Sequence, residues 1–279
     1  LVRWFGKPSQ NTFTSFFTAA NFLAYAQNLQ LVRSADLTKA NNATSGSQNI
    51  VIANKDILDV EYAVGVADAN CGMYAARYPS DLGNSIKVAL WASANSTAFG
   101  GWDYRADFNG VPGTSEWASA RGGANDEMHI IVIDTLGNFS GTKGAVLEKF
   151  PYLSKASDAA NFDGSSNYYV NVINDRSQYI YIMNHAQAAN GLSETTSWGR
   201  AASNLGYGQS SNEYTYNLAN GNFAMATDGD LELGYDKFIN PEEVDVSLVI
   251  TGGHSKTIQQ YVIDNICEAR KDCIAFVSP

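Results

Sequence analysis

Cysteine is scarce in this sequence, and basic residues are in the minority. The 279 residues include only three cysteines, and no two of them have the C-x-x-C spacing, so a disulfide framework or a zinc site has little support. We expect Cys71, Cys267 and Cys273 to be buried free thiols. Lys and Arg number 18 against 28 Asp and Glu, and the resulting net charge of −10 disfavours nucleic acid and anionic membranes as partners.

Long apolar segments are missing as well. No apolar run approaches the ~18 residues that a membrane span needs, and no basic segment followed by an apolar one has the layout of a signal peptide. The sequence does contain 45% hydrophobic and 12% aromatic residues, which is typical of a globular protein. A chain of this length can form two domains.

The two ends of the chain have α/β patterns. Apolar residues at helical spacing predict a helix within residues 9–28, and residues 29–34 predict a strand. Near the other end we expect a helix that Asp228 caps, a strand at 244–250, a helix containing Ile258 and Ile266, and a last strand at 273–278. A strand, a helix and a second strand in this order predict parallel pairing through a right-handed crossover.

The middle of the chain predicts a β-rich domain. Short β-prone runs, separated by turn residues, occupy 60–66, 72–79, 85–93, 128–135 and 167–174. Residues 95–126 are rich in glycine and aromatic residues without alternation, which predicts a long exposed loop or insertion. Residues 144–162 predict a short helix or turn that Pro151 breaks.

These patterns together predict a mixed α/β, or α+β, fold with two domains. Residues 1–41 and 226–279 form an α/β core domain that ends in the βαβ unit, and the β-rich domain of residues 42–225 interrupts it. The aperiodic segment ADLTKANNATSGSQN, residues 35–49, is typical of a crossing between domains.

The turn TGGHSKT, residues 251–257, is the best candidate for an enzymatic site. It lies between a strand and a helix, where α/β proteins bind phosphate through backbone N–H groups. A P-loop ending in Lys256 and Thr257 would need glycine where Ile250 and Ser255 stand. A phosphate-binding or hydrolytic protein that uses the Gly252–Thr257 turn is therefore an alternative. We favour a tight turn in which Gly252 and Gly253 supply unusual dihedrals and Ser255 caps the helix.

An acidic segment and the histidines give weaker signals. Asp228, Asp230, Glu232 and Asp236 could bind calcium, but their segment lacks the glycine and the bidentate glutamate of a calcium loop, which favours an acidic helix start. The three histidines, His129, His185 and His254, stand in no G-x-S-x-G context and are expected at the surface or in the core. We therefore predict no catalytic, metal-binding or cofactor-binding residue.

Aromatic residues gather in the glycine-rich segment. Trp102, Tyr104, Phe108 and Trp117 could form an exposed surface that stacks against sugars, so a glycan-binding module is another alternative. We favour the interpretation that they pack inside the insertion, because large aromatic side chains are usually buried.

Four segments follow one another in a recognisable order: LVRWFGKPSQNTFTSFFTAANFLAYAQNLQLVRSAD, ARYPSDLGNSIKV, GDLELGYDKFINPEEVDVSLVITGG and VIDNICEARKDCIAFVSP. They contain an F-G-x-P opening, a Y-P-x-x-x-G-[ND] turn, here Tyr78, Pro79, Gly83 and Asn84, and a V-D-V-x-L strand with an A-R-x-D-C ending. In this order they resemble the contractile tail sheath protein of T-even-type bacteriophages, over most of the chain.

The resemblance implies a structural protein and not an enzyme. Copies of such a protein stack in hexameric rings around a tail tube, and contraction drives the tube through the host envelope for genome delivery. The implied partners are further copies of the protein, the tail tube, the baseplate and the tail terminator, and no cofactor is implied. The implied location is the virion, after assembly in the host cytoplasm. The sheath of another contractile particle, such as a pyocin or a secretion system, is an alternative.

The chain departs from the family pattern at two places. Family members carry a further β-rich insertion after the first core strand, where this chain has only residues 38–49, TKANNATSGSQN. The family's N-terminal segment and large C-terminal portion, which supply strands to neighbouring subunits, have no counterpart here. We therefore expect the chain to be a fragment that is monomeric, while the complete protein polymerises.

Overall fold

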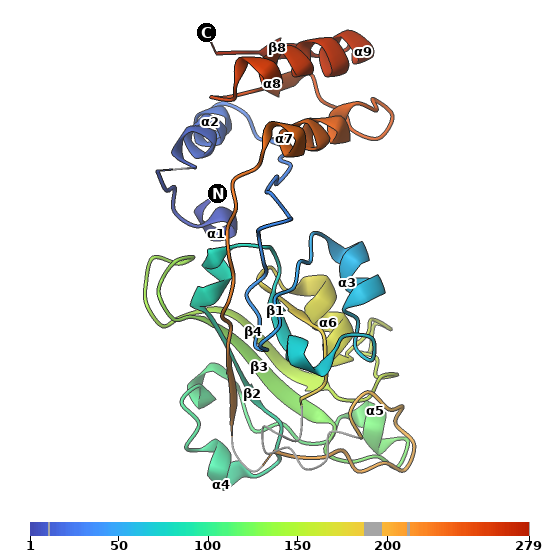
Figure 1. The fold of residues 1–279 in the computed structure, drawn as a ribbon. Helices are drawn as coiled ribbons and strands as arrows, with labels where there is room; N and C mark the ends of the chain where they lie inside the picture. The colour runs from blue at the N-terminus through green and yellow to red at the C-terminus, as the bar shows by residue number, and fades with distance from the viewer. Residues whose placement is uncertain (11, 187–196, 211–212, 279) are drawn as a thin grey trace. The chain divides into compact units, whose positions relative to one another are not determined.

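The chain forms two compact units. A computed structural model describes residues 1–10, 12–186, 197–210 and 213–278. The smaller unit joins Leu1–Ala40 to Phe223–Pro279, and the larger unit is the continuous segment Asn41–Asn222 (Figure 1). Both units contain helices and strands, and the strands belong to several sheets, which confirms the predicted mixed α+β fold class.

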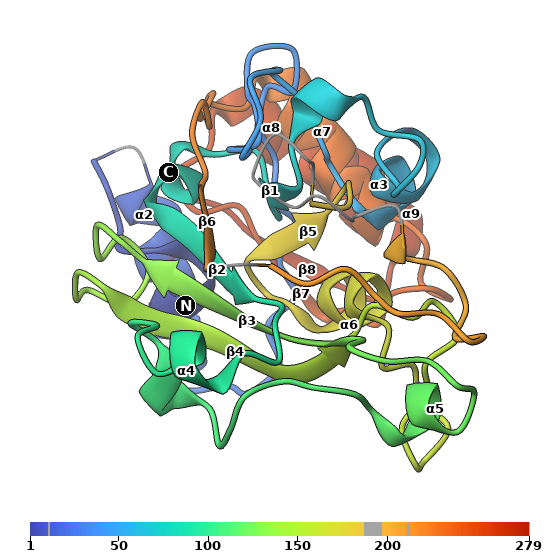
Figure 2. The same cartoon turned by 90° about the horizontal axis from the view of Figure 1, so that it is seen from below.

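A four-stranded antiparallel sheet lies at the centre of the larger unit (Figure 2). Its order is β4 (Ala145–Ser154), β3 (Glu127–Asp134), β2 (Ile86–Trp91) and β6 (Tyr214–Asn217). A second antiparallel pair joins β1 (Tyr74–Ala76) to β5 (Ile180–Ile182). The strands predicted within 72–79, 85–93 and 128–135 are therefore confirmed as β1, β2 and β3.

Both faces of β2 and β3 are buried, which explains their nearly unbroken apolar sequences. Val88 and Val132 are paired neighbours and belong to the main core of the unit. Ala89 and Ile131 are the next pair; they point to the opposite face and pack against the aromatic residues of the 95–126 segment. A strand that is covered on both sides needs no polar alternation.

Helices surround these sheets. In the larger unit they are α3 (Lys55–Glu61), α4 (Ser96–Phe99), α5 (Glu116–Ser119) and α6 (Tyr169–Arg176), with short 3₁₀ turns at Ala69–Cys71, Asp81–Ser85 and Arg105–Asp107. The strands predicted at 60–66 and 167–174 are therefore wrong, because the chain forms α3 and then turns in the first segment and α6 in the second.

The β-prone sequence of α6 becomes helical because of its tertiary contacts. Tyr169, Val172 and Ile173 recur at helical spacing and are buried in the main core. Asn174 fixes the helix to β5, since its side chain accepts a hydrogen bond from the N–H of Ile182 at 2.7 Å and donates to the carbonyl of Ile182 at 3.2 Å. Burial of these apolar side chains outweighs their weak intrinsic preference for strands.

The helix or turn predicted for residues 144–162 is also wrong, because β4 runs through Pro151. The strand lies at an edge of the sheet, and its register against β3 shifts between Met128 and Ile130. Tyr152 there has a φ of 52° and donates its N–H to Nδ1 of His129 at 3.0 Å. Proline is tolerated because the chain bulges away from the ladder at this point.

The smaller unit contains the predicted βαβ unit. Strands β7 (Leu248–Ile250) and β8 (Ile274–Phe276) are parallel, as predicted. Between them α8 (Lys256–Tyr261) continues through a π-turn (Val262–Cys267) into α9 (Glu268–Arg270). The other helices are α1 (Val2–Phe5), α2 (Phe13–Leu23) and α7 (Asp228–Tyr235), followed by a 3₁₀ turn at Asp236–Phe238.

Two details of the smaller unit differ from expectation. Residues 29–34 form no strand, and Leu31 and Val32 within them are exposed, so this apolar run has no sheet to join. The N-terminal cap of α7 is Thr227 and not Asp228: the Thr227 hydroxyl accepts from the N–H of Asp230, while the Asp230 carboxylate accepts from the N–H of Thr227.

Candidate functional site

The turn between β7 and α8 is shaped by a buried threonine and two glycines. Thr251 is buried, and both its N–H and its hydroxyl donate to the carbonyl of Phe276 on β8, at 3.1 and 3.2 Å. Gly252 has a φ of 59°, in the left-handed region that favours glycine. Glycine is needed at position 253 because of close packing: a Cβ there would lie 2.8 Å from the methyl carbon of Thr14.

A carboxylate lies beside this turn, next to the residue that caps α8. The Ser255 hydroxyl accepts a hydrogen bond from the N–H of Ile258 at 3.4 Å, which confirms Ser255 as the cap of α8. The same hydroxyl donates to Oδ2 of Asp228 at 3.1 Å. Because Asp228 would repel a second anion, the turn is better explained as a capped helix start than as a phosphate site. Lys256 is exposed.

Replacing Ser255 by alanine tests this assignment. We expect Ser255→Ala to reduce the free energy of unfolding by about 1 kcal/mol, because an N–H at the start of α8 loses its acceptor. Urea denaturation measures the change, and Thr257→Ala, at an exposed position of the same helix, is the matched control with little effect. Equal losses for the two variants would show that Ser255 does not cap the helix.

One face of the β7–β8 sheet is apolar and exposed. Side chains alternate along a strand, so Val249 points towards α8 and the π-turn, where it packs against Ile258 and Val262. Leu248, Ile274 and Phe276 point to the opposite side and are 46%, 65% and 56% exposed. We call these three residues the outer face. Helices usually cover both faces of a parallel sheet, so the outer face is the most unusual surface of the smaller unit.

Exposed apolar residues are concentrated in the smaller unit more generally. Of the 21 large hydrophobic residues that are exposed among those described, 16 belong to the smaller unit, although its two segments are only 40 and 57 residues long. The larger unit contributes only Val60, Val66, Leu136, Val146 and Phe162. This concentration makes the smaller unit the better candidate for contacts with a partner.

The two segments of the smaller unit carry opposite charge. Residues 1–40 contain four basic residues and one acidic residue, a net charge of +3. Residues 223–279 contain four basic and ten acidic residues, a net charge of −6. The smaller unit therefore combines two segments of opposite net charge.

The histidines do not form a catalytic group. His129 is buried, and its Nε2 donates to the carbonyl of Gly110 at 2.8 Å while its Nδ1 accepts from Tyr152. Burial lowers the pKa of His129 and of His185, whose Nδ1 is hydrogen-bonded to the Tyr169 hydroxyl. Both nitrogens of the His129 ring are thus hydrogen-bonded within the packing, and His185 is anchored through its Nδ1.

The acidic helix start has structural partners of its own. Asp230 closes the capping box of α7, and Asp236 accepts from the Tyr261 hydroxyl at 2.6 Å. Within the described ranges, no three His, Cys, Asp or Glu side chains are grouped so that they could hold a metal ion. No helix in the described part of the chain is both long enough and apolar enough to cross a membrane.

The aromatic segment packs inwards, which confirms the favoured interpretation that its large side chains lie inside the insertion. Trp102 and Phe108 are 4% and 8% exposed, and their rings stack at 5.3 Å. Phe108 in turn stacks on His129 at 4.3 Å. Trp117 belongs to a separate cluster, and the guanidinium of Arg121 lies 3.5 Å from the centre of its ring. The tryptophans therefore do not form a common platform for a sugar.

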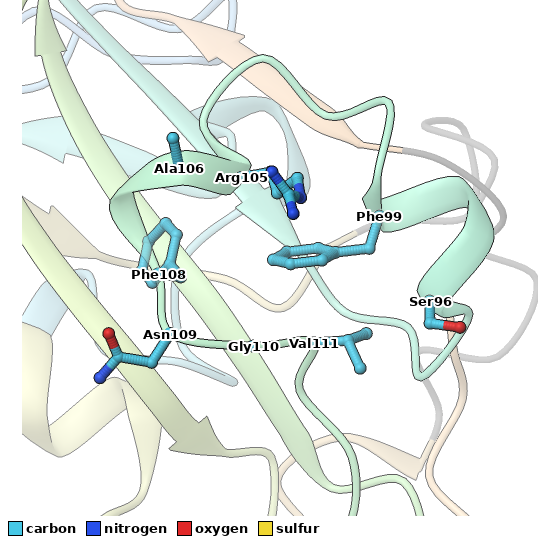
Figure 3. A pocket seen from close by; sticks show the side chains of 8 residues that line it. All are labelled: Ser96, Phe99, Arg105, Ala106, Phe108, Asn109, Gly110 and Val111. Atoms are coloured by element: carbon cyan, nitrogen blue, oxygen red, sulfur yellow. The ribbon is translucent and has the colours of Figure 1, made fainter.

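A shallow pocket of about 440 Å³ lies beside this cluster. Side chains of Phe99, Arg105 and Phe108 surround it (Figure 3), and Val111 completes its apolar lining. The pocket holds no group of acids, bases or nucleophiles in hydrogen-bonded contact, so its residues suggest no reaction.

A buried lysine went undetected in the sequence. Lys155 is fully buried, and its ammonium donates to the carbonyls of Asn125 at 2.8 Å and Ala92 at 3.1 Å. Burial lowers its pKa to about 7, although the charges of Asp126 and Glu127 oppose the shift. Its neighbours in sequence, Ser154 and Ala156, give no signal for this role. Lys155 joins the ends of β2, β3 and β4.

Comparison with known proteins adds the decisive observation. No family model matches the chain. The tail sheath protein of Salmonella phage ViI is 32% identical over 146 residues, which cover 52% of this chain and 20% of that protein. The tail sheath protein of Vibrio phage KVP40 is 24% identical over 375 aligned residues, which cover all of this chain and 55% of that protein. The chain is similar to bacteriophage tail sheath proteins.

This similarity confirms the resemblance to tail sheath proteins that the four segments indicated. The chain spans about half the length of one of these tail sheath proteins and a fifth of the other. The match to the Vibrio phage tail sheath protein extends over more positions, 375, than the 279 residues of this chain. That relative therefore has additional residues within the matched range.

Proposed function

We propose that the chain is part of a structural subunit of a contractile phage tail sheath. The complete gene product polymerises in stacked hexameric rings around the tail tube and contracts to drive the tube through the host envelope. The observation that carries this proposal is the similarity to a tail sheath protein along the entire chain. Because the chain spans only part of its relatives, polymerisation is assigned to the complete gene product, and the chain alone is expected to be monomeric.

The smaller unit, corresponding to the predicted core domain of residues 1–41 and 226–279, is the part that we assign to polymerisation. Three features support this assignment: the concentration of exposed apolar residues, the uncovered outer face, and the opposite charges of its two segments. Opposite charges on one unit favour head-to-tail contacts, and such contacts generate rings or helical assemblies.

The larger unit, corresponding to the predicted domain of residues 42–225, is assigned to the outside of the sheath. It buries both faces of β2 and β3 within itself and exposes few large apolar residues, so it needs no neighbour to complete its core. The partners of the complete protein are the tail tube, the baseplate and the tail terminator. Its location is the virion, after assembly in the host cytoplasm, and it has no catalytic role.

A charge placed on the outer face tests the assignment of the smaller unit. In the complete gene product, Ile274→Asp is expected to abolish polymerisation, because it places a carboxylate in an apolar contact between copies. The same substitution in the isolated chain should change the free energy of unfolding by less than about 0.5 kcal/mol, because Ile274 is exposed there. Sedimentation measures the first effect and urea denaturation the second.

The matched control is Val60→Asp, a similar charge at a position of the larger unit that is 71% exposed. We expect this variant to polymerise normally. Normal assembly of Ile274→Asp would show that the outer face is not a contact between copies.

A further inference from the structure

Two of the three cysteines lie close together in the smaller unit. The Sγ atoms of Cys267 and Cys273 are 3.5 Å apart, and both residues are partly buried. Cys71 is different: it is 1% exposed, lies in the larger unit, and its thiol is directed at Oε1 of Gln48. The expectation of buried free thiols therefore holds fully only for Cys71.

The turn that joins the two thiols is fixed by the buried side chain of Arg270. Its guanidinium forms a two-pronged ion pair with Asp272, with N···O distances of 2.8 and 2.9 Å. Another nitrogen of the same group donates to the carbonyls of Phe238 at 2.6 Å and Val244 at 2.9 Å. Because four hydrogen bonds from this planar group fix the turn, the thiols are held as neighbours.

We propose that Cys267 and Cys273 are a site of reversible oxidation, which closes an intramolecular disulfide when the protein meets an oxidised low-molecular-weight disulfide such as oxidised glutathione. The sulfur atoms need to approach by only about 1.5 Å to reach the length of a disulfide. Six positions separate the two residues, so the closed ring is small.

The chemistry is a pair of thiol–disulfide exchanges. One protein thiol loses its proton and attacks a sulfur of oxidised glutathione, which releases one glutathione as its thiolate. The second protein thiolate then attacks the mixed disulfide and releases the other glutathione. In sum, the two cysteines lose two electrons and two protons, and one oxidised glutathione becomes two reduced molecules.

The surroundings make Cys267 a weak nucleophile at neutral pH. Burial and the neighbouring thiol of Cys273 raise the pKa of Cys267 to about 11, and the charge of Glu268 adds to this rise while that of Arg270 opposes it. The thiolate form of Cys267 is therefore scarce near pH 7.

Closure would join the C-terminal end of the α8–α9 helix to the start of β8. Cys267 is the last residue of the π-turn, and Cys273 directly precedes β8. A covalent link there restrains the unfolded βαβ unit, so it raises the melting temperature of the smaller unit by several degrees. This inference does not depend on the proposed sheath function.

The experiment counts free thiols in two samples of the chain, one left untreated and one incubated in the native state with oxidised glutathione. Each sample is then denatured, labelled with a maleimide and weighed intact by mass spectrometry. We expect three labels before oxidation and one afterwards, with a total mass about 2 Da lower before labelling, and dithiothreitol should restore three labels. Cys71→Ser should fall from two labels to none.

Variants separate an internal disulfide from other products. Cys273→Ser has two thiols and cannot form the internal disulfide. Under the same treatment it should accept one glutathione at Cys267 and keep one label. Circular dichroism and thermal melts before oxidation establish that each variant is folded. Three labels retained by the wild-type chain, a stable glutathione adduct in place of the 2 Da loss, or a disulfide-linked dimer on a non-reducing gel would each overturn the proposal.

Discussion

Replacing Asp134 by alanine is expected to lower the free energy of unfolding by about 3–5 kcal/mol. Asp134 is fully buried at the end of β3, and its carboxylate organises the loop that leads to β4. It accepts hydrogen bonds from the backbone N–H groups of residues 137–140, at 2.8 to 3.0 Å, and from the hydroxyls of Ser85 and Ser140. The variant leaves these donors without their common acceptor.

This stabilisation should depend on pH. Burial by itself would raise the pKa of Asp134, but the hydrogen bonds from Ser140, Ser85 and Phe139 together outweigh it and lower the pKa below 3.8. The stabilising effect is therefore present above the pKa of the unfolded chain and is lost as the pH falls through the lower pKa of the folded state. The difference between wild type and variant should shrink below about pH 4.

Urea denaturation at pH 7 measures the effect, with Asp163→Ala as the matched control. Asp163 is also an aspartate that accepts from a turn, with its Oδ1 bonded to the N–H and hydroxyl of Ser165, but it is exposed. The control should cost less than about 1 kcal/mol, because water replaces the lost acceptor. A loss below that value for Asp134→Ala would contradict the role assigned to the carboxylate.

The second large effect is a difference in the free energy of unfolding between wild type and Lys155→Met that changes with pH. The pKa of Lys155 in the folded protein is about 7, whereas an exposed lysine has a pKa of 10.5. Between these values the unfolded chain binds more protons than the folded one, so the stability of the wild type rises with pH. The rise relative to Lys155→Met is about 1.4 kcal/mol per pH unit at its steepest, and it is absent below pH 7.

Urea denaturation at half-unit steps from pH 6 to pH 10 measures this slope. Lys143→Met, in an exposed turn, controls for removing a lysine from the chain. Two parallel stability curves for the wild type and Lys155→Met would show that the folded protein keeps Lys155 protonated over the whole range. The methionine also removes two hydrogen bonds to carbonyls, so the slope, and not the offset, is the informative quantity.

The elements that could be predicted are those whose own residues show a clear apolar pattern or clear end signals. Strands β2 and β3 have nearly continuous apolar runs because both faces are covered, and the βαβ unit has clear caps and turns. The predictions were wrong where contacts between residues far apart in the sequence determine the structure. Helix α6 is held by β5, and Pro151 fits β4 only because the strand is at an edge and bulges. Neither condition can be inferred from a short window of residues.

The candidate site was predictable to a similar extent. Ser255 as a helix cap follows from its position before the helix, and the structure confirms it. The partner of Ser255, Asp228, and the contact of Gly253 with Thr14 join residues far apart in the sequence, so no local pattern indicates them. The alternation of Ile274, Ala275 and Phe276 is visible in the sequence, but which face stays uncovered depends on where the helices pack.

Negative-stain electron microscopy of the complete gene product tests the central claim most directly. A tail sheath subunit should form long tubes with regular transverse striations, built from stacked rings, while the isolated chain of 279 residues should remain dispersed under the same conditions. Dispersed single particles of the complete gene product at every protein concentration would contradict the assignment. Striated tubes formed by the isolated chain alone would contradict the proposal that polymerisation needs the complete protein.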